Sequence, residues 1–144
     1  MFAPHVQQAT PEAIAADVAA GVAQLRARGA TRIFTVGFCF GGGYSWRQSA
    51  DTEGLAGCVG FYGRPSLVTD AVDRMRAPLL MLIAGADANL PLADTEALAT
   101  AAGVQVPVEL VVFDGSPHSF FDRSFAEHEA ACARAWDEIQ RFVS

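Results

Sequence analysis

The strongest constraint on the fold is a regular alternation of strand-like and helix-like segments along the 144 residues. The strand-like segments are short runs rich in β-branched and other apolar residues, at 31–36, 55–62, 79–84 and 106–113. The helix-like segments lie before and between them, at 10–29, 44–50, 70–75 and 92–102, with a last one from Ser124 onward. Because the connections are short, this alternation predicts parallel strands joined by right-handed crossovers. We therefore expect a three-layer α/β/α fold with about four parallel strands.

The strand-like segments differ in where they should lie in the sheet. The 79–84 run is apolar at every position, as is typical of a central strand covered on both faces. The 106–113 run carries one charge, Glu109, which favours a place near a sheet edge.

Two of the helix-like segments carry recognisable end signals. Thr10 is a suitable N-cap for the first helix and Gly29 a suitable terminator. Its apolar stripe within alanine-rich sequence predicts a helix that lies on the sheet. Ser124 and Glu127 match a capping box, which predicts that the last helix begins there.

Composition and charge exclude several classes of protein. Hydrophobic residues make up 51% and charged residues 18%, enough for one packed domain spanning 1–144. Ten Lys and Arg against 16 Asp and Glu give a net charge of −6, which argues against a nucleic-acid partner. No apolar run reaches the roughly 18 residues of a membrane span, and no signal-peptide pattern is present. Three cysteines at unrelated spacings favour neither a disulfide framework nor a metal site, and predict a cytoplasmic location.

A candidate nucleophile follows the first strand-like segment, where residues 37–41 read Gly-Phe-Cys-Phe-Gly. This is the glycine-flanked strand-to-helix turn G-x-S-x-G with Cys39 in the serine position. Glycines are expected on either side because side chains there would collide with the strand or the helix. The N–H of Phe40 is then a candidate oxyanion donor. The alternatives are a tight turn with a buried cysteine, or a phosphate loop, although the Lys-Ser/Thr of such a loop is missing.

Such a nucleophile requires an acid and then a histidine, each after a later strand. Asp87 follows the 79–84 strand and His118 follows the 106–113 strand, so both should lie at the carboxyl edge of the sheet beside Cys39. Asp94 and Asp114 are competing acids, one expected inside a helix and the other beside the histidine's own strand. Asp87 could instead be a turn former, and His118 a loop histidine without a role.

At these residues the chain resembles the dienelactone hydrolase family, the cysteine branch of the α/β-hydrolase fold. The matching motifs are G-F-C-F-G-G, F-Y-G at 61–63, A-G-A-D at 84–87 and P-H-S-F at 117–120. The resemblance implies an enzyme that opens lactones or small enol esters with no metal and no cofactor. It implies that Cys39, His118 and Asp87 are the triad and that the Phe40 N–H is one oxyanion donor. Cys58 and Cys132 are predicted to fill the core.

The chain departs from the family pattern in two respects. Where the family has an arginine that contacts a substrate carboxylate, this chain has Asp122, with Arg123 one place later as a candidate substrate ligand. Family members also have four strands before the helix at 10–29, and that part holds a second oxyanion donor and a glutamate that controls ionisation of the cysteine. The chain therefore matches the C-terminal part of the fold. One oxyanion donor is typically worth about 10²–10³ in turnover.

Without those strands, the 31–36 strand is predicted to be an unpaired apolar edge. We expect either a homodimer through this edge or a chain cut from a longer protein. The function expected is hydrolysis of a small lactone or ester by a Cys–His–Asp triad through a thioester. The alternatives are a half-domain that binds or dimerises without catalysis, and transfer of the acyl group to a thiol or amine.

Overall fold

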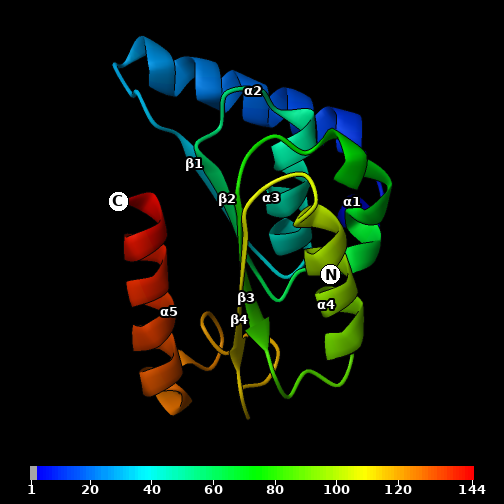
Figure 1. The fold of residues 1–144 in the computed structure, drawn as a ribbon, viewed down its shortest axis with the longest axis vertical. Coiled ribbons are helices and arrows are strands. Elements are labelled where there is room, and N and C mark those ends of the chain that lie inside the picture. Colours follow the sequence, from blue (N-terminus) through cyan, green and yellow to red (C-terminus); the bar gives the residue numbers. More distant parts are fainter. Residues whose placement is uncertain (1–2) are drawn as a thin grey trace.

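Four strands form one fully parallel sheet in the computed structural model, which describes residues 3–144 (Figure 1). The strand order is β1-β2-β3-β4, so the strands lie side by side in the order of the sequence. The strands are β1 Phe34–Phe38, β2 Gly57–Phe61, β3 Leu79–Ala84 and β4 Val108–Phe113. The parallel sheet of four strands is confirmed.

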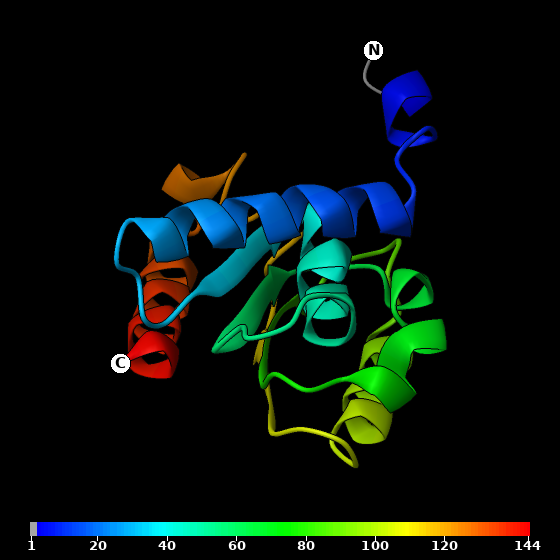
Figure 2. The ribbon, with the colours of Figure 1, turned by 90° about the horizontal axis from the view of Figure 1, so that it is seen from above.

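Helices cover both faces of this sheet. The α-helices are α1 Ala3–Val6, α2 Pro11–Ala27, α3 Phe40–Asp51, α4 Leu92–Ala102 and α5 Glu129–Val143. Three short 3₁₀ helices connect them: η1 Pro65–Leu67, η2 Thr69–Arg74 and η3 Phe125–Glu127. Figure 2 shows α3 and α4 on one side of the sheet and α5 on the other, which gives the expected three layers.

The hydrophobic core is divided into two clusters by the sheet. Because side chains alternate along a strand, Leu79 and Met81 of β3 pack with Trp46 on the α3 side, whereas Leu80 and Leu82 pack on the α5 side. Every residue of β3 is buried, so the central position of this strand is confirmed.

The position of β4 also agrees with the sequence. It is an edge strand, as its one charged residue predicts. The Glu109 carboxylate pairs with the guanidinium of Arg141 on α5, which satisfies that charge at the surface.

Several predicted boundaries shift. The helix predicted at 44–50 begins earlier, at Phe40, because the glycines at 41–43 continue the helix. The segment predicted as a helix at 70–75 is the 3₁₀ helix η2. The predicted capping box is wrong: the Ser124 side chain makes no capping hydrogen bond, and α5 starts only at Glu129.

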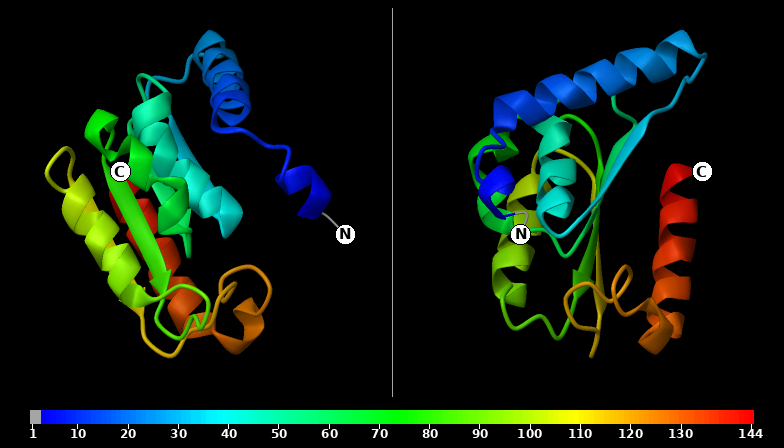
Figure 3. Two further views of the ribbon diagram at one scale, coloured as in Figure 1. Left: turned by 90° about the vertical axis from the view of Figure 1, so that its right-hand side faces the viewer. Right: turned by 180° about the vertical axis from the view of Figure 1, so that it is seen from behind.

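The first long helix, α2, forms as predicted but does not lie on the sheet. Thr10 caps it by accepting a hydrogen bond from the N–H of Ala13 at 3.2 Å, and Gly29 ends it with φ +94°. No residue of α2 is buried; the helix passes over one end of the sheet and contacts α3 (Figure 3). Val22 packs against the core, whereas Leu25 remains 47% exposed.

The outer edge of β1 is unpaired among the described residues, as the sequence predicts for this strand. The strand spans Phe34–Phe38 rather than 31–36, and Ile33 is buried just before it. Val36 is 58% exposed on this edge. Of the helices that the structure describes, none has both the length and the apolar character of a bilayer-spanning segment.

Candidate active site

Cys39 occupies a sharp turn between β1 and α3. Its backbone has φ 55° and ψ −119°, a left-handed conformation that costs energy for any residue with a Cβ. The Cys39 N–H donates to the carbonyl of Phe61 at the end of β2 at 3.1 Å, which fastens the turn to the sheet. The turn therefore holds the sulfur at the carboxyl edge of the sheet, where the sequence places it.

The glycines around this turn have unequal roles. A Cβ on Gly37 would lie 1.9 Å from the carbonyl oxygen of Gly41, so only glycine fits there. A Cβ on Gly41 would meet nothing within 4 Å, so the predicted collision at that position is wrong. The close approach is made one residue later, because a Cβ on Gly42 would lie 2.3 Å from the carbonyl oxygen of Phe61.

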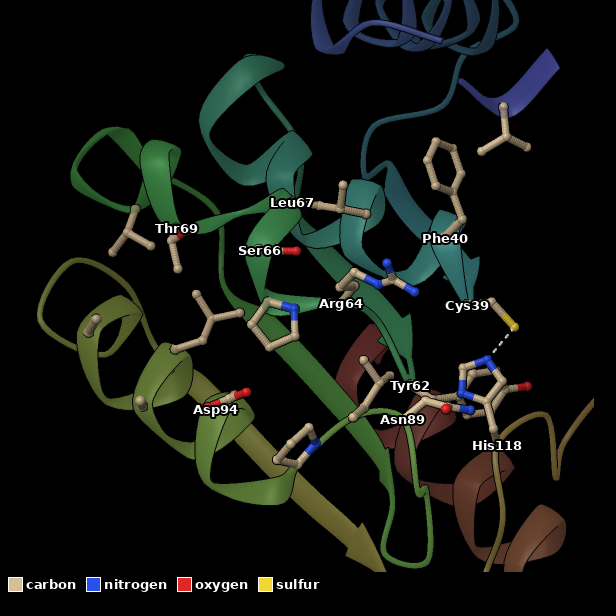
Figure 4. A pocket seen from close by; sticks show the side chains of 18 of the residues that line it. Cys39, Phe40, Tyr62, Arg64, Ser66, Leu67, Thr69, Asn89, Asp94 and His118 are labelled. Atoms are coloured by element: carbon tan, nitrogen blue, oxygen red, sulfur yellow. Dashed lines mark hydrogen bonds between the residues drawn. The ribbon is translucent and has the colours of Figure 1, made fainter. Parts of the chain in front are cut away.

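The side chains of Cys39, His118 and Asp87 meet in the order that a triad requires. The Nε2 atom of His118 lies 3.1 Å from the Sγ atom of Cys39 (Figure 4). The Nδ1 atom on the other side of the ring bonds to the Oδ2 atom of Asp87. One ring nitrogen can thus take a proton from sulfur while the other is held by the carboxylate.

The carboxylate of Asp87 is held in a position from which it can orient the His118 imidazole. Its side chain is only 2% exposed, although it follows β3 in a surface turn. Its other oxygen, Oδ1, accepts the N–H of Asn89 at 2.9 Å, so both carboxylate oxygens are engaged. The competing acids lie elsewhere, Asp94 in the first turn of α4 and Asp114 exposed after β4.

The N-terminus of α3 supplies the candidate oxyanion donor. The carbonyl of Cys39 accepts from the N–H groups of Gly42 at 3.0 Å and Gly43 at 3.3 Å. The N–H of Phe40, at the first position of the helix, has no acceptor within the helix, as is general for a first turn. It lies beside the sulfur at the end of the helix where the dipole favours negative charge.

Ser119 is a site residue that the sequence did not reveal. Its Oγ atom lies 3.4 Å from the Sγ atom of Cys39, and it has a positive φ of 63°. Within residues 3–144, the non-glycine residues with positive φ are Cys39, Tyr62 and Ser119, and all three lie around the triad. The motif P-H-S-F contained the serine, but nothing in a sequence indicates a positive φ at this position.

Tyr62, the tyrosine of the F-Y-G motif, packs against the ring of His118. Its ring centroid is 4.9 Å from that of the His118 imidazole, and its hydroxyl donates to Oδ1 of Asp122 at 2.6 Å. Burial and the neighbouring carboxylate raise the pKa of Tyr62 far above its usual value, so the phenol stays protonated. Asp122 therefore fastens the segment after His118 to the residue that follows β2.

A groove of about 1270 Å³ opens from the triad. Arg123, the candidate substrate ligand, is exposed and does not line this groove. Arg64 lines it instead, and Figure 4 shows its side chain extending toward the Cys39 end. The sequence offered no signal for Arg64, because its position depends on how the chain folds after β2.

The other two cysteines are set apart from this chemistry. Cys58 is fully buried in β2, and burial raises the pKa of its thiol to about 11. Cys132 is partly buried on α5, where burial also raises the pKa. Both contribute to the core clusters as predicted. Among the residues that the structure describes, no group of three or more His, Cys, Asp or Glu side chains is placed to hold a metal ion.

Comparison with known proteins identifies the family of the chain. A model of the dienelactone hydrolase family matches residues 1–144. A protein of Saccharolobus solfataricus, provisionally named a carboxymethylenebutenolidase, is 27% identical over 138 residues, which are 95% of this chain and 53% of that protein. A protein of the same provisional name from Salmonella typhi is 28% identical over 121 residues, 76% of this chain and 45% of its own. The chain thus spans about half the length of these relatives.

Solved structures give the same picture of the fold. The crystal structure of a provisionally assigned dienelactone hydrolase from Klebsiella pneumoniae has a TM-score of 0.73 and 26% identity. The match covers 85% of this chain and 57% of that one. An esterase from Pyrococcus furiosus has a TM-score of 0.70 at 18% identity, covering 89% of this chain and 61% of its own.

Proposed function

Because the chain belongs to the dienelactone hydrolase family, we propose that it carries the catalytic triad of a carboxylic ester or lactone hydrolase, with Cys39 as the nucleophile. One observation carries this proposal above the others. The His118 imidazole lies between the Cys39 sulfur, 3.1 Å away, and the buried carboxylate of Asp87. The substrate class proposed is a small lactone or ester of the kind that a carboxymethylenebutenolidase opens.

In the first half of the reaction, Nε2 of His118 takes the proton of the Cys39 thiol. The thiolate attacks the carbonyl carbon, forming a C–S bond and placing negative charge on the carbonyl oxygen. The Phe40 N–H, at the N-terminus of α3, stabilises that oxyanion. When the tetrahedral intermediate collapses, the C–O bond breaks and the leaving alkoxide takes the proton from the imidazolium, which leaves a thioester on Cys39.

In the second half, His118 takes a proton from a water molecule, and the hydroxide attacks the thioester carbonyl. The second tetrahedral intermediate expels the Cys39 sulfur, which recovers its proton from the imidazolium. Asp87 keeps the ring in the tautomer with Nδ1 protonated throughout both halves. A lactone gives one ring-opened hydroxy acid, because its leaving alkoxide stays attached to the acyl group.

Hydrolysis of p-nitrophenyl acetate tests the proposal. We expect the parent chain to release p-nitrophenolate, and Cys39→Ala to reduce kcat/KM by about 10³ or more. Cys132→Ala is the matched control, since this thiol lies away from His118, and it should retain parental turnover. Intact-protein mass spectrometry of a quenched reaction should show an acetyl group on the parent and none on Cys39→Ala.

Two results would overturn the proposal. The first is a Cys39→Ala variant that hydrolyses the ester as fast as the parent. The second is a folded parent chain that turns over no ester and forms no acyl adduct, which favours a half-domain that binds or dimerises. Acyl transfer to an added thiol or amine in preference to water would instead indicate the transferase alternative.

A further inference from the structure

The groove extends well beyond the three triad residues. Cys39 and His118 lie at one end, and the far part runs between η1–η2 on one side and α4 on the other (Figure 4). We call this far part the α4 arm and define it by Val72, Ala97, Leu98 and Ala101. Since α4 begins near the carboxyl edge of β3 and runs back along the sheet, Ala101 lies roughly 10 Å further along the helix axis than Asp94.

The chemistry of the lining changes along the groove. Near the triad it includes Arg64 and Asn89, which can bind the polar part of an ester. The residues that define the α4 arm are aliphatic, and three exposed polar residues, Ser66, Thr69 and Asp94, line the groove beside them. This division suits a molecule with a polar reactive group at one end and an apolar chain at the other.

The groove is also large for the substrates that the family resemblance implies. Pockets that enclose a drug-sized molecule measure roughly 300–1,000 Å³, and this groove measures about 1270 Å³. Small residues create part of the space, because Ala97 and Ala101 are four residues apart on α4 and both line the arm. A small lactone would leave the α4 arm empty.

The opposite wall of the arm is held in place by a buried cation. The guanidinium of Arg47 on α3 donates to the carbonyl of Leu67 at 3.0 Å and pairs with Asp70 of η2. Its Nε atom also donates to Asp51 at 2.8 Å. Because η1 and η2 are fastened to α3 in this way, the arm is open before any ligand binds, and a ligand spends no binding energy on forming it.

We propose that the α4 arm binds an aliphatic part of the ester. The protein then acts on linear esters with an extended aliphatic part as well as on small esters. The inference rests on the proposed ester hydrolysis and names the substrate class of the same site. The aliphatic part can belong to the acyl group or to the alcohol, since both are attached to the carbonyl carbon that Cys39 attacks. Each methylene that enters the arm should raise kcat/KM by about two- to fourfold until the arm is full.

Two series of substrates at concentrations below micelle formation test this inference. One is p-nitrophenyl acetate, butyrate, hexanoate and octanoate, which lengthens the acyl group. The other is ethyl, butyl and hexyl acetate, which lengthens the alcohol. We expect kcat/KM to rise with chain length in one series, chiefly through a lower KM, and the series in which it rises identifies the part that enters the arm.

A substitution that fills the arm provides the structural control. In Ala101→Phe the octanoate-to-acetate ratio of kcat/KM, or the hexyl-to-ethyl ratio in the alcohol series, should fall toward 1. The residue is exposed, so the larger ring does not disturb the core. Thr100→Phe places the same ring on the same helix at an exposed position that does not line this groove, and should keep the parental ratio.

The outcomes separate this inference from the proposed function. If acetate is hydrolysed but neither series shows a gain with length, or if Ala101→Phe keeps the parental ratio, the α4 arm does not bind substrate and ester hydrolysis stands. If the parent chain hydrolyses no ester of any length, the proposed function itself fails.

Discussion

Single residues at this site are held in conformations that the sheet and the loops around it impose. Cys39, Tyr62 and Ser119 all have positive φ without being glycine, which side chains disfavour. All three lie around the same sulfur, which is where strain is expected when a reactive geometry is imposed on a chain. Gly37 is the residue that makes the Cys39 turn possible, because no Cβ fits at that position.

Asp87→Asn should disable the histidine without disturbing the fold. The N–H of Asn89 bonds to Oδ1 of residue 87 and so requires an oxygen there. The new amide must then turn its NH₂ toward Nδ1 of His118, so that Nδ1 accepts and the ring proton moves to Nε2. A protonated Nε2 atom can no longer accept the proton of the Cys39 thiol. We expect kcat/KM for p-nitrophenyl acetate to fall by about 10²–10⁴, with an unchanged circular dichroism spectrum. Parental activity in this variant would contradict the role given to Asp87.

The three cysteines should react very differently with iodoacetamide. Cys39 lies 3.1 Å from a base and borders an open groove, so we expect it to be alkylated first at pH 8. Cys58 is fully buried with a thiol pKa of about 11, so almost none of it is ionised at that pH. Peptide mapping by mass spectrometry should therefore find one rapidly modified cysteine, and the same experiment in 6 M guanidinium chloride should find three. Equal labelling of Cys39 and Cys58 in the native chain would contradict this ordering.

At the scale of elements, α3 is the centre of the arrangement. It starts at the nucleophile, packs on β1 and β2, and holds η1 and η2 through Arg47. Arg47 is only 8% exposed at its side chain and pairs with two carboxylates, Asp51 and Asp70. The wall of the groove and the turn that carries the sulfur thus depend on the same helix.

Arg47→Met should therefore cost far more stability than loss of a surface ion pair. Removing the cation leaves the partly buried Asp51 carboxylate with only the exposed Arg74 as a partner, and we expect the free energy of unfolding to fall by about 3 kcal/mol. Glu53→Gln, which removes only the exposed carboxylate paired with Arg76, is the control and should cost at most about 1 kcal/mol. Urea titrations of both variants measure these values, and equal losses would show that Arg47 is not an anchor.

Arg47→Met should also change how the free energy of unfolding depends on pH under acidic conditions. The Arg47 guanidinium lowers the pKa of Asp70 below its unfolded value of 3.8. That carboxylate therefore stabilises the fold above pH 3.8, and its contribution is lost as the pH falls through the lower folded pKa. Between pH 5 and pH 3, urea titrations of Arg47→Met should show a smaller loss of stability than those of the parent.

The elements differ in how well their sequences predicted them, for physical reasons. The 79–84 strand and the 92–102 helix have the predicted bounds, because an unbroken apolar run and an alanine-rich segment each have one favourable structure. The start of α3 was missed because three successive glycines disfavour a helix. The close approach of the helix to β2 nevertheless requires glycine at 42. The capping box at Ser124 was a local pattern that the packing of the chain did not use.

At the scale of the whole molecule, the convergence of Cys39, Asp87 and His118 was predictable because three strand ends of a parallel sheet bring their next residues to one edge. Arg64, Tyr62 and Ser119 were not, since each is placed by the path of a loop rather than by the order of strands. The sheet is also asymmetric at this scale. The β4 edge carries a charged pair, whereas the β1 edge presents Val36 to solvent.

Self-association through β1 remains a prediction, and one substitution tests it. Val36 is 58% exposed on β1, whose outer edge is unpaired within residues 3–144, and such an edge pairs with a second strand or aggregates. We expect sedimentation velocity to show a dimer at high concentration and Val36→Lys to shift it to the monomer. Val104→Lys, at a residue that is 80% exposed and follows α4, should leave the dimer unchanged. A parent chain that is monomeric at millimolar concentration would rule out the β1 dimer.

All three triad side chains stand on connections that follow strands, and none stands on a strand. The strands of the sheet and the connections that carry these three side chains can consequently change independently of each other. Insertions in those connections would diversify what is cleaved while the buried strands stay as they are. For directed evolution, libraries confined to the exposed positions of the segments after β2, β3 and β4 would explore new selectivity while leaving the core clusters intact.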